Sequence, residues 1–421
     1  MTPAEKHKLT AKCGIVYSPS SPVDRLQLFA GRSEQVKQVA KAVTTKGRHA
    51  IMYGNRGVGK TSLAMVMREV FADVEGLRVV KVNCVETDKF DTVWVRALAE
   101  ISIIHEPPAD DDDMTVKEYS LDQYVDPNIP LGPGEVRQLL QKVSSPQFLV
   151  VLIFDEFDRL DPAYRAHFAD AIKDLSDSNV YSTLVLVGVA RDVNDLIIEH
   201  ASISRCLAQI PMPPMSGLEL EEIVQKANNQ LGMTISGDAL NLIVGLSQGL
   251  PHYTHLIAQE TTYQAIDSGR LDIQMDDVDV GIREALKGVD QILLVTYRKA
   301  AEGQRRGTLF PQVMLACALA KTNDLGEFSS VDVRDRLHCI TGKRYEIPNF
   351  SQHLDKLSTD PTRGMVLEKN GVPRRFRFRF RNPLMRPYIL MRGLVDGDIN
   401  GDLVTNWSGS SDPNSNLLFE T

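Results

Sequence analysis

The most informative stretch of the sequence is a glycine-rich loop that ends in a lysine and a threonine. It has the spacing G-x-x-x-x-G-K-[ST], and the candidate nucleotide-binding residues are Gly54, Asn55, Arg56, Gly57, Val58, Gly59, Lys60, Thr61 and the following Ser62. A strand-like run precedes the loop and a helical pattern follows it, so backbone N–H groups and a helix N-terminus would converge on one anion-sized hollow. Lys60 would hold the β- and γ-phosphates of a nucleotide, and Thr61 would ligate Mg²⁺. The loop therefore predicts a site whose cofactors are ATP and Mg²⁺.

Two adjacent carboxylates form the second chemical feature. Residues 149–154 are uniformly apolar and end in Asp155 and Glu156, so a buried strand would deliver both side chains to the carboxyl edge of a sheet. Asp155 would orient Mg²⁺ and its waters. Glu156 would act as the general base on the attacking water, a role that needs a carboxylate beside the γ-phosphate. The pair therefore predicts that the nucleotide is hydrolysed.

Near the C-terminal end, arginine alternates with phenylalanine. In a strand with this period of two, the phenylalanines would face a core and the arginines would share the other face, and these are Arg375, Arg377, Arg379 and Arg381. Four guanidinium groups about 7 Å apart suit a row of phosphates, so contact with the DNA backbone is the favoured interpretation. Two alternatives stay open. The arginine face would dock on the acidic body of the protein or on another subunit, or it would be a solvated edge strand guarded by charge.

The spacing of apolar runs predicts the elements that position these residues. Strand-like runs alternate with amphipathic segments and occupy residues 49–53, 77–83, 148–154, 183–189 and 207–210. Runs that are apolar on both faces are typical of a parallel sheet covered by helices. We therefore expect an α/β fold, in which a P-loop ATPase domain has a parallel sheet flanked by helices.

The remaining chain predicts further domains. Helical spacing without strand alternation indicates a small helical lid, and three helices followed by a hairpin outline a winged helix. The expected segments are a polar N-terminal tail (1–24), the ATPase domain (25–215) with an acidic exposed insertion (107–134), the lid (216–290), the winged helix (291–395) and a polar C-terminal tail (396–421).

Composition excludes several classes of protein. The chain has 421 residues, of which 43% are hydrophobic and 24% charged, so it is neither disordered throughout, collagenous nor a coiled coil. Its apolar runs are far shorter than the ~18 residues of a membrane helix. Five cysteines without a C-x-x-C pair argue against a disulfide framework and a structural zinc site. We therefore expect a cytoplasmic protein without a membrane partner.

Charge is distributed unevenly along the chain. The net charge is −8, yet residues 305–392 hold 17 Lys and Arg against 8 Asp and Glu. A basic C-terminal domain on an acidic body is the result. This asymmetry keeps a nucleic-acid partner possible despite the negative total.

Several short motifs resemble those of the AAA+ and STAND branches of P-loop ATPases, over roughly residues 28–389. Residues 29–32 look like the motif that these families place before the phosphate loop, near the adenine. Arg191, just after a predicted strand, is similar to the arginine sensor of STAND proteins. Gly249-Leu250-Pro251 matches the G-x-P motif of STAND and related ATPases, which implies that Pro251 contacts the nucleotide.

Other features resemble the AAA+ initiators. Arg205, just before the last predicted strand, resembles the arginine finger that acts on a neighbouring subunit's nucleotide, which implies an ATP-dependent homo-oligomer or a partner protein. The AAA+ sensor 2 arginine has no evident counterpart, and His252 or His255 is an open substitute. The order of ATPase domain, lid and winged helix is that of origin-recognition-type initiators and of STAND proteins.

We therefore expect an AAA+-type ATPase with initiator-like architecture, in which MgATP binding and hydrolysis change the packing of the lid and the winged helix and hence engagement with DNA or a partner. The alternative is a STAND-like signalling switch, in which bound nucleotide holds a closed form and no DNA is contacted. A third possibility is a nucleotide-dependent assembly scaffold with little turnover.

Overall fold

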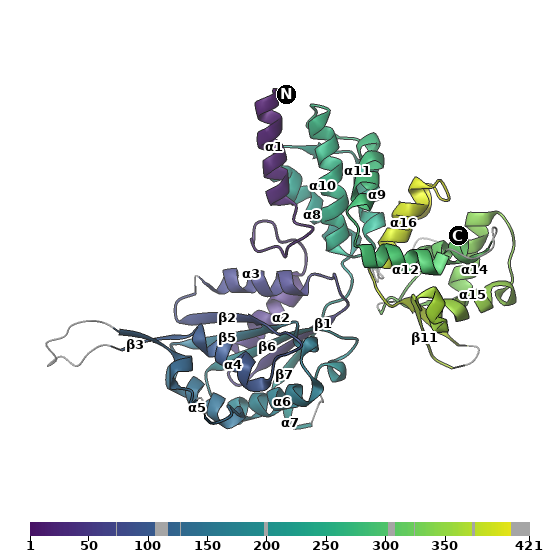
Figure 1. The fold of residues 1–421 in the computed structure, drawn as a ribbon. Coiled ribbons are helices and arrows are strands. Elements are labelled where there is room, and N and C mark those ends of the chain that lie inside the picture. The colour runs from purple at the N-terminus through teal and green to yellow at the C-terminus, as the bar shows by residue number, and fades with distance from the viewer. Residues whose placement is uncertain are drawn as a thin grey trace, which may run out of the picture. The chain divides into compact units, whose positions relative to one another are not determined.

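The computed structural model (Figure 1) describes residues 1–72, 74–105, 117–126, 128–197, 201–301, 308–323, 325–372 and 375–405. The chain forms two compact units. The sheet unit comprises Pro22–Asn55 and Lys60–Met212, and the helical unit comprises Met1–Ser21, Arg56–Gly59 and the chain from Pro213 onward. The expected boundary between a lid and a winged helix falls inside the helical unit and stays a prediction.

The sheet unit is built on a parallel sheet of five strands in the order β2-β5-β6-β1-β7. The strands are β1 (His49–Gly54), β2 (Leu77–Asn83), β5 (Leu149–Asp155), β6 (Ser182–Val189) and β7 (Leu207–Pro211). β5 and β6 are buried along nearly their whole length, as expected of strands covered on both faces. The predicted α/β fold with a parallel sheet is confirmed, and each predicted strand is present within one residue at either end.

Helices cover both faces of this sheet. They are α2 (Ser33–Thr44), α3 (Lys60–Ala72), α4 (Phe90–Ala99), α5 (Pro133–Val143), α6 (Pro162–Asp177) and the short α7 (Ala201–Ser204). Figure 1 shows α3 on one side of the sheet and α5 and α6 on the other. The ring of Phe154 in β5 lies 5.0 Å from those of Trp94 in α4 and Phe168 in α6. Since side chains alternate along a strand, the next residue, Asp155, points to the α3 side.

The first residue of β1 is a buried histidine. The Nδ1 atom of His49 accepts a hydrogen bond from the backbone N–H of Leu184 at 2.9 Å, and the Nε2 atom lies 3.1 Å from the hydroxyl of Ser176. Burial lowers the pKa of His49 from 6.5 to about 3. A neutral imidazole is therefore part of the folded sheet unit.

We expect His49 to make the protein acid-sensitive. Because the pKa of His49 is lower in the folded than in the unfolded chain, its full contribution to stability is present above about pH 6.5 and declines as the pH falls toward 3. Between pH 6.5 and 5 the free energy of unfolding should fall by about 2 kcal/mol on this account. His49→Asn keeps an acceptor near Nδ1 but cannot titrate, so urea unfolding across this range should show a smaller loss. The exposed His7→Asn is the control, and an unchanged pH slope in His49→Asn would contradict the prediction.

The predicted acidic insertion is structured in part. Strand β3 (Ser102–His105) pairs antiparallel with β4 (Lys117–Ser120), and a 3₁₀ turn follows at Leu121–Tyr124. Leu121 is fully buried, so the chain returns to the core before α5 begins. The expectation of an exposed insertion is therefore wrong at Leu121 and Leu131, which are buried, whereas residues 128–130 are exposed as expected, and the four acids at 110–113 lie outside the described residues.

Four helices occupy the segment where a lid was expected. They are α8 (Gly217–Leu231), α9 (Gly237–Ser247), α10 (Pro251–Asp267) and α11 (Met275–Lys287). Two strands of two residues each, β8 (Thr234–Ile235) and β9 (Asp272–Ile273), pair in parallel between them. The helices agree with the predicted helical spacing, whereas these short strands were not predicted.

The N-terminal segment forms a helix, α1 (Pro3–Val16), where a polar tail was expected. Thr2 and Glu5 make a capping box at its start. The helix packs against α8 and α10, and Tyr17 at its end is buried and donates a hydrogen bond to Asn228 Oδ1 at 3.0 Å. The expected tail is wrong here because capping starts the helix and a narrow apolar strip is enough to hold it.

The chain beyond the lid segment contains helices and a small antiparallel sheet. Its elements are α12 (Gln291–Ala301), α13 (Phe310–Leu319), β10 (Phe328–Ser329), α14 (Ser330–Thr341), α15 (Ile347–Thr359), β11 (Leu367–Asn370), β12 (Arg377–Phe380), α16 (Met385–Val395) and α17 (Asp402–Thr405). The order helix, strand, two helices and hairpin over α13 to β12 is the one expected for a winged helix, which itself stays a prediction. β12 lies between β10 and β11, so the interpretation of the arginine strand as an edge strand is wrong.

The predicted C-terminal tail also begins with structure. Val404 in α17 is buried, and its carbonyl oxygen would lie 2.7 Å from a Cβ placed on Gly245 of α9. The expectation of a tail is therefore wrong for residues 402–405, and the residues after 405 are outside the described part. Within the ranges given above, no helix has the length and apolar character needed to cross a membrane.

Candidate nucleotide site

The phosphate loop, residues 54–61, joins β1 to α3 and depends on glycine. Gly57 and Gly59 have φ values of 85° and 92°, a left-handed conformation that a side chain would strain. A Cβ on Gly54 would lie 2.3 Å from the carbonyl oxygen of Met212, so only glycine allows β1 to end this close to the chain leaving β7. The Met212 N–H donates to the carbonyl of Tyr53 at 2.7 Å, which fixes that approach.

Lys60 is folded over its own loop. The side chain is almost fully buried, and Nζ donates to the carbonyl oxygens of Gly54 at 3.0 Å and Asn55 at 2.8 Å. Phosphate oxygens are stronger hydrogen-bond acceptors than carbonyl oxygens. A phosphate bound in the loop would therefore attract the ammonium of Lys60 away from these two carbonyls. Ser62, the last residue of the predicted set, accepts a hydrogen bond from the backbone N–H of Val23 at 3.2 Å.

The two predicted Mg²⁺ ligands come together in the sheet unit. The hydroxyl of Thr61 donates to Asp155 Oδ1 at 3.4 Å, although these residues are 94 positions apart in the chain. The same oxygen accepts the backbone N–H of Glu156 at 2.9 Å. Because a hydroxyl and a carboxylate are both hard oxygen ligands, this pair suits a magnesium ion.

A third side chain, missed by the sequence analysis, shares this carboxylate. Lys81 Nζ lies 3.0 Å from Asp155 Oδ2 and donates to Asn83 Oδ1 at 2.5 Å. The register of the sheet explains why Lys81 and Asp155 are close. Asn83 of β2 is opposite Asp155 of β5, and Lys81 lies two residues before Asn83 on the same face of β2. The signal in the sequence is a lysine within the apolar run of residues 77–83, since a charge on the covered side of a sheet needs a partner.

Glu156, the predicted general base, has an unusual backbone and an ion pair. Its φ of 54° lies in the left-handed region, which is uncommon for a residue with a side chain. Its Oε2 atom is 2.9 Å from the guanidinium of Arg159, and its side chain is 49% exposed. The carboxylate therefore starts from a solvent-accessible ion pair beside Asp155.

The tip of the phosphate loop, Arg56–Gly59, groups with the helical unit. A Cβ on Gly59 would lie 3.6 Å from Cγ of Pro251, the first residue of α10. Gly249 has a φ of 77°, and a Cβ there would meet Pro214 at 2.5 Å, so the G-x-P turn requires its glycine. The G-x-P motif and the loop tip are therefore neighbours within this unit.

Two predicted arginines have contacts within the sheet unit. The backbone N–H of Arg191 donates to Asp195 Oδ2 at 2.9 Å, and the residue is exposed. Arg205 pairs with Asp177 of α6 at 2.6 Å, and its side chain is 70% exposed. Their roles as sensor and finger stay predictions.

The two histidines considered as sensor 2 substitutes hold the N-terminal segment. The Nδ1 atom of His252 is 2.7 Å from the carbonyl of Pro19, and the N–H of Ser18 donates to Nδ1 of His255 at 3.4 Å. Burial lowers the pKa of both rings, that of His255 to about 4. Their contacts give them a structural role between α10 and the chain after α1.

The two faces of β12 differ as the period of two predicts. Phe378 and Phe380 are buried in the small sheet's core. Phe376 is half-buried, and Lys369 Nζ lies 4.0 Å from the centre of its ring.

The arginine side of β12 is partly neutralised. Arg379 pairs with Glu368, the residue opposite it on β11, at 2.6 Å. Arg381 donates through Nε to a carbonyl of β11 at 3.2 Å, whereas Arg375 and Arg377 are exposed. The four guanidinium groups are therefore not equivalent, as the expected row would require. Arg375, Arg377 and Arg381 are exposed, whereas Arg379 is paired with Glu368.

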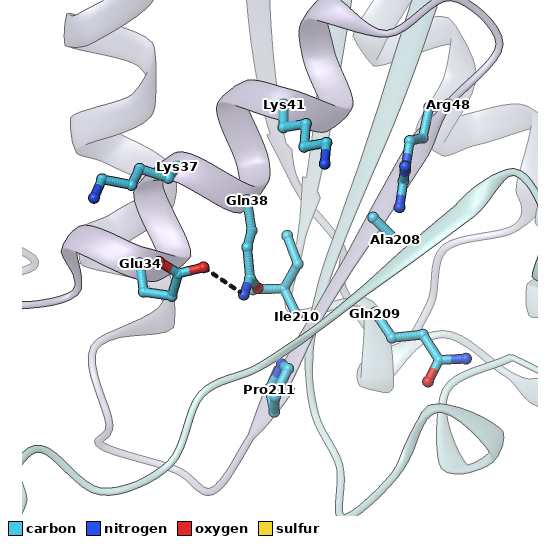
Figure 2. Close-up of a pocket in the computed structure, with 9 residues that line it drawn as sticks. All are labelled: Glu34, Lys37, Gln38, Lys41, Arg48, Ala208, Gln209, Ile210 and Pro211. Atoms are coloured by element: carbon cyan, nitrogen blue, oxygen red, sulfur yellow. Dashed lines mark hydrogen bonds between the residues drawn. The ribbon is translucent and has the colours of Figure 1, made fainter.

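A separate hollow of about 410 Å³ lies between α2 and β7 (Figure 2). Basic and polar side chains line it together with the strand: Glu34, Lys37, Gln38, Lys41, Arg48, Ala208, Gln209, Ile210 and Pro211. The amide of Gln38 donates to Glu34 at 3.1 Å, as the dashed line in Figure 2 shows. No predicted site residue lines this hollow, so the chemistry of the phosphate loop lies elsewhere.

The residues of the loop fit a nucleotide with a divalent cation. Glycines leave the loop amides accessible, a buried ammonium lies over the loop, and a hydroxyl contacts a buried carboxylate. Among the described residues, no group of three or more His, Cys, Asp or Glu side chains forms another metal site.

Known proteins resemble this chain in sequence and in fold. The family model described as "Novel STAND NTPase 1" matches residues 23–293. The Walker-type ATPase of Pyrococcus abyssi is 13% identical and aligns over 89% of this chain and 99% of that chain, with a TM-score of 0.51 that indicates a shared fold. Cdc6p of Pyrobaculum aerophilum (16% identity, 92% and 99% covered, TM-score 0.45) and the Orc1 protein of Aeropyrum pernix in complex with DNA (16%, 91% and 97%, 0.45) are also similar. No curated protein matches the chain.

Proposed function

Because the chain belongs to the Novel STAND NTPase 1 family, we propose that it binds and hydrolyses MgATP and couples the nucleotide state to engagement of DNA or a protein partner. The observation that carries this proposal is the contact of Thr61 with Asp155 at the end of β5, next to Lys60, whose ammonium donates to the loop carbonyl of Gly54. These side chains would bind the phosphates and Mg²⁺. Glu156, the residue after Asp155, is the proposed general base for hydrolysis.

The roles of the chain's own residues follow from their positions. Lys60 exchanges its carbonyl partners for phosphate oxygens, while the loop amides donate to the same phosphates. Thr61 and Asp155 would hold Mg²⁺, which would supply charge neutralisation at the phosphates. Glu156 leaves Arg159 and accepts the proton of the attacking water. Pro251 packs against the loop tip and thereby relates the nucleotide to α10.

Two arginines complete the proposed cycle. Arg191 senses the γ-phosphate from the end of β6, and Arg205 exchanges Asp177 for the nucleotide of a neighbouring copy. The exposure of Arg205 supports this role, because an arginine that acts on another subunit must be accessible. An ATP-dependent homo-oligomer or a partner protein is thereby implied.

We further propose that α13 to β12 form a winged helix that contacts the DNA backbone through Arg375, Arg377 and Arg381. The order of elements supports the winged helix, and the exposed guanidinium groups support phosphate contact. The domain limits at 215, 290 and 395 belong to the same proposal.

DNA binding is tested with ATP, with ADP and without nucleotide, over a range of salt. We expect log affinity for duplex DNA to fall with log salt by roughly 0.9 per phosphate neutralised. Arg375→Gln/Arg377→Gln should flatten that slope by about two units and weaken binding to every sequence alike, because backbone contacts carry no sequence information. The matched control Arg283→Gln/Lys287→Gln removes two cations from α11 and should leave the slope unchanged.

The same experiment also tests the alternative function, a signalling switch that does not contact DNA. A specific observation favours that alternative: Glu368 neutralises Arg379 within the strand pair, which leaves a shorter row of unneutralised guanidinium groups for DNA phosphates. If the protein bound no DNA at low salt with either nucleotide, and the Arg375→Gln/Arg377→Gln variant altered hydrolysis or oligomer size, the switch would replace the initiator-like function.

A further inference from the structure

We propose that Lys81 is a built-in counter-ion of Asp155 and that Mg²⁺ must compete with its ammonium for this carboxylate. The inference rests on the proposed function in one respect, the use of Asp155 by Mg²⁺. It goes beyond that function by assigning a role to a residue outside the phosphate loop and the acidic pair.

Burial strengthens the attraction between Lys81 and Asp155 and also raises the cost of removing either one. The side chains of Lys81 and Asp155 are 7% and 3% exposed, and their charged atoms are 3.0 Å apart. In such a setting the attraction between the charges is weakly screened, and removing one partner leaves the other charge buried without compensation. The ammonium of Lys81 therefore neutralises the carboxylate of Asp155.

The contacts of Asp155 show what a metal ion would have to displace. Oδ1 accepts from the hydroxyl of Thr61 and from the N–H of Glu156, and Oδ2 faces Lys81. Oδ1 thus accepts two hydrogen bonds from the chain, whereas Oδ2 is buried without a hydrogen bond and has only the ion contact with Lys81. Mg²⁺, or water bound to it, needs lone pairs of the same carboxylate and meets the ammonium as a like charge.

Lys81 has a second acceptor that allows the exchange. Its Nζ donates to Asn83 Oδ1, which lies on the same face of β2. When a cation binds Asp155, the ammonium keeps this amide as a partner and moves away from the carboxylate. Metal binding is consequently weaker than the carboxylate alone would give, and a higher Mg²⁺ concentration is needed to enhance nucleotide binding.

Thermal unfolding in EDTA without nucleotide tests the pair itself. Lys81→Met should lower Tm by roughly 5 °C or more, since one buried charge is left alone. Asp155→Asn should also lower Tm, whereas Lys81→Met/Asp155→Asn should recover most of the loss because both charges are gone. Additive losses in the double variant would overturn the pair.

Binding of a fluorescent ATP analogue at increasing Mg²⁺ tests the competition. In Lys81→Met, the Mg²⁺ concentration that gives half of the maximal increase in analogue binding should fall by roughly tenfold or more. The reason is that Mg²⁺ then supplies the positive charge that Asp155 has lost with the ammonium of Lys81. Lys37→Met, an exposed lysine on α2, should behave like the wild type, and Lys81→Arg, which keeps the charge, should too. Equal half-maximal concentrations in Lys81→Met and the wild type would overturn the competition.

Failure of the inference and failure of the proposed function give different results. A wild type that binds no analogue at any Mg²⁺ concentration contradicts the nucleotide site, and the melting series in EDTA still decides whether Lys81 and Asp155 pair. If Lys81→Met does not fold, Asn83→Ala replaces it in the Mg²⁺ titration. Loss of its second acceptor should bind Lys81 more tightly to Asp155 and raise the half-maximal concentration, and an unchanged or lower value would overturn the exchange.

Discussion

Lys60→Ala is expected to abolish nucleotide binding in an otherwise folded protein. The variant keeps the loop amides but loses the side-chain cation that lies over the loop and that we propose holds the β- and γ-phosphates. A loss of affinity of roughly a hundredfold or more follows, because a charge-assisted contact to phosphate in a buried site is removed. Equilibrium binding of a fluorescent ATP analogue, with Tm as the check on folding, measures it.

The control for this variant is Lys173→Ala, which removes an exposed lysine of α6 in the same unit. It should bind the analogue like the wild type. ATP affinity that stays unchanged in folded Lys60→Ala would mean that the phosphates bind elsewhere, and the assignment of the whole loop would fail with it.

Glu156→Gln is expected to bind ATP normally and to hydrolyse it ~10²-fold or more slowly. The amide keeps the size of the side chain but cannot accept the proton of the attacking water. The left-handed backbone at this position is retained, since the change begins at the end of the side chain. Single-turnover hydrolysis, measured beside analogue binding, separates the chemical step from affinity.

Glu100→Gln is the matched control, because Glu100 is an exposed carboxylate at the end of α4. It should leave both binding and turnover at wild-type values. Hydrolysis at the wild-type rate in Glu156→Gln would show that another group, or water alone, takes the proton.

The parts of the fold that the sequence predicts are those with a strong local signal. The strands of the parallel sheet are continuous apolar runs, and β5 is apolar until Asp155 ends it. The phosphate loop combines glycines with a lysine at fixed spacing between a strand and a helix. In both places one short window of the chain determines the structure, so no knowledge of distant neighbours is needed.

The missed features depend on partners far away in the chain or on the register of strands. Helix α1 has a narrow apolar strip whose burial depends on α8 and α10. The pairing of Lys81 with Asp155 and that of Arg379 with Glu368 follow from which residues face each other across two strands. Alternation along one strand predicts its faces, but it does not tell what lies opposite on the next strand.

The position of β1 between β6 and β7 also determines when the site can form during synthesis. β1 pairs with β6 and β7, and the bond from Leu184 to His49 spans 135 residues. The phosphate loop therefore leaves the ribosome long before the strands that frame it, and at about 5–20 residues per second β7 follows roughly 8–30 s later. Until β6 has been made, for most of that interval, β1 lacks both neighbours, and an apolar strand without neighbours is a template for wrong pairing. β2, β5 and β6, which emerge in the order in which they pair, are in a position to assemble first, and β1 joins them as β7 is completed.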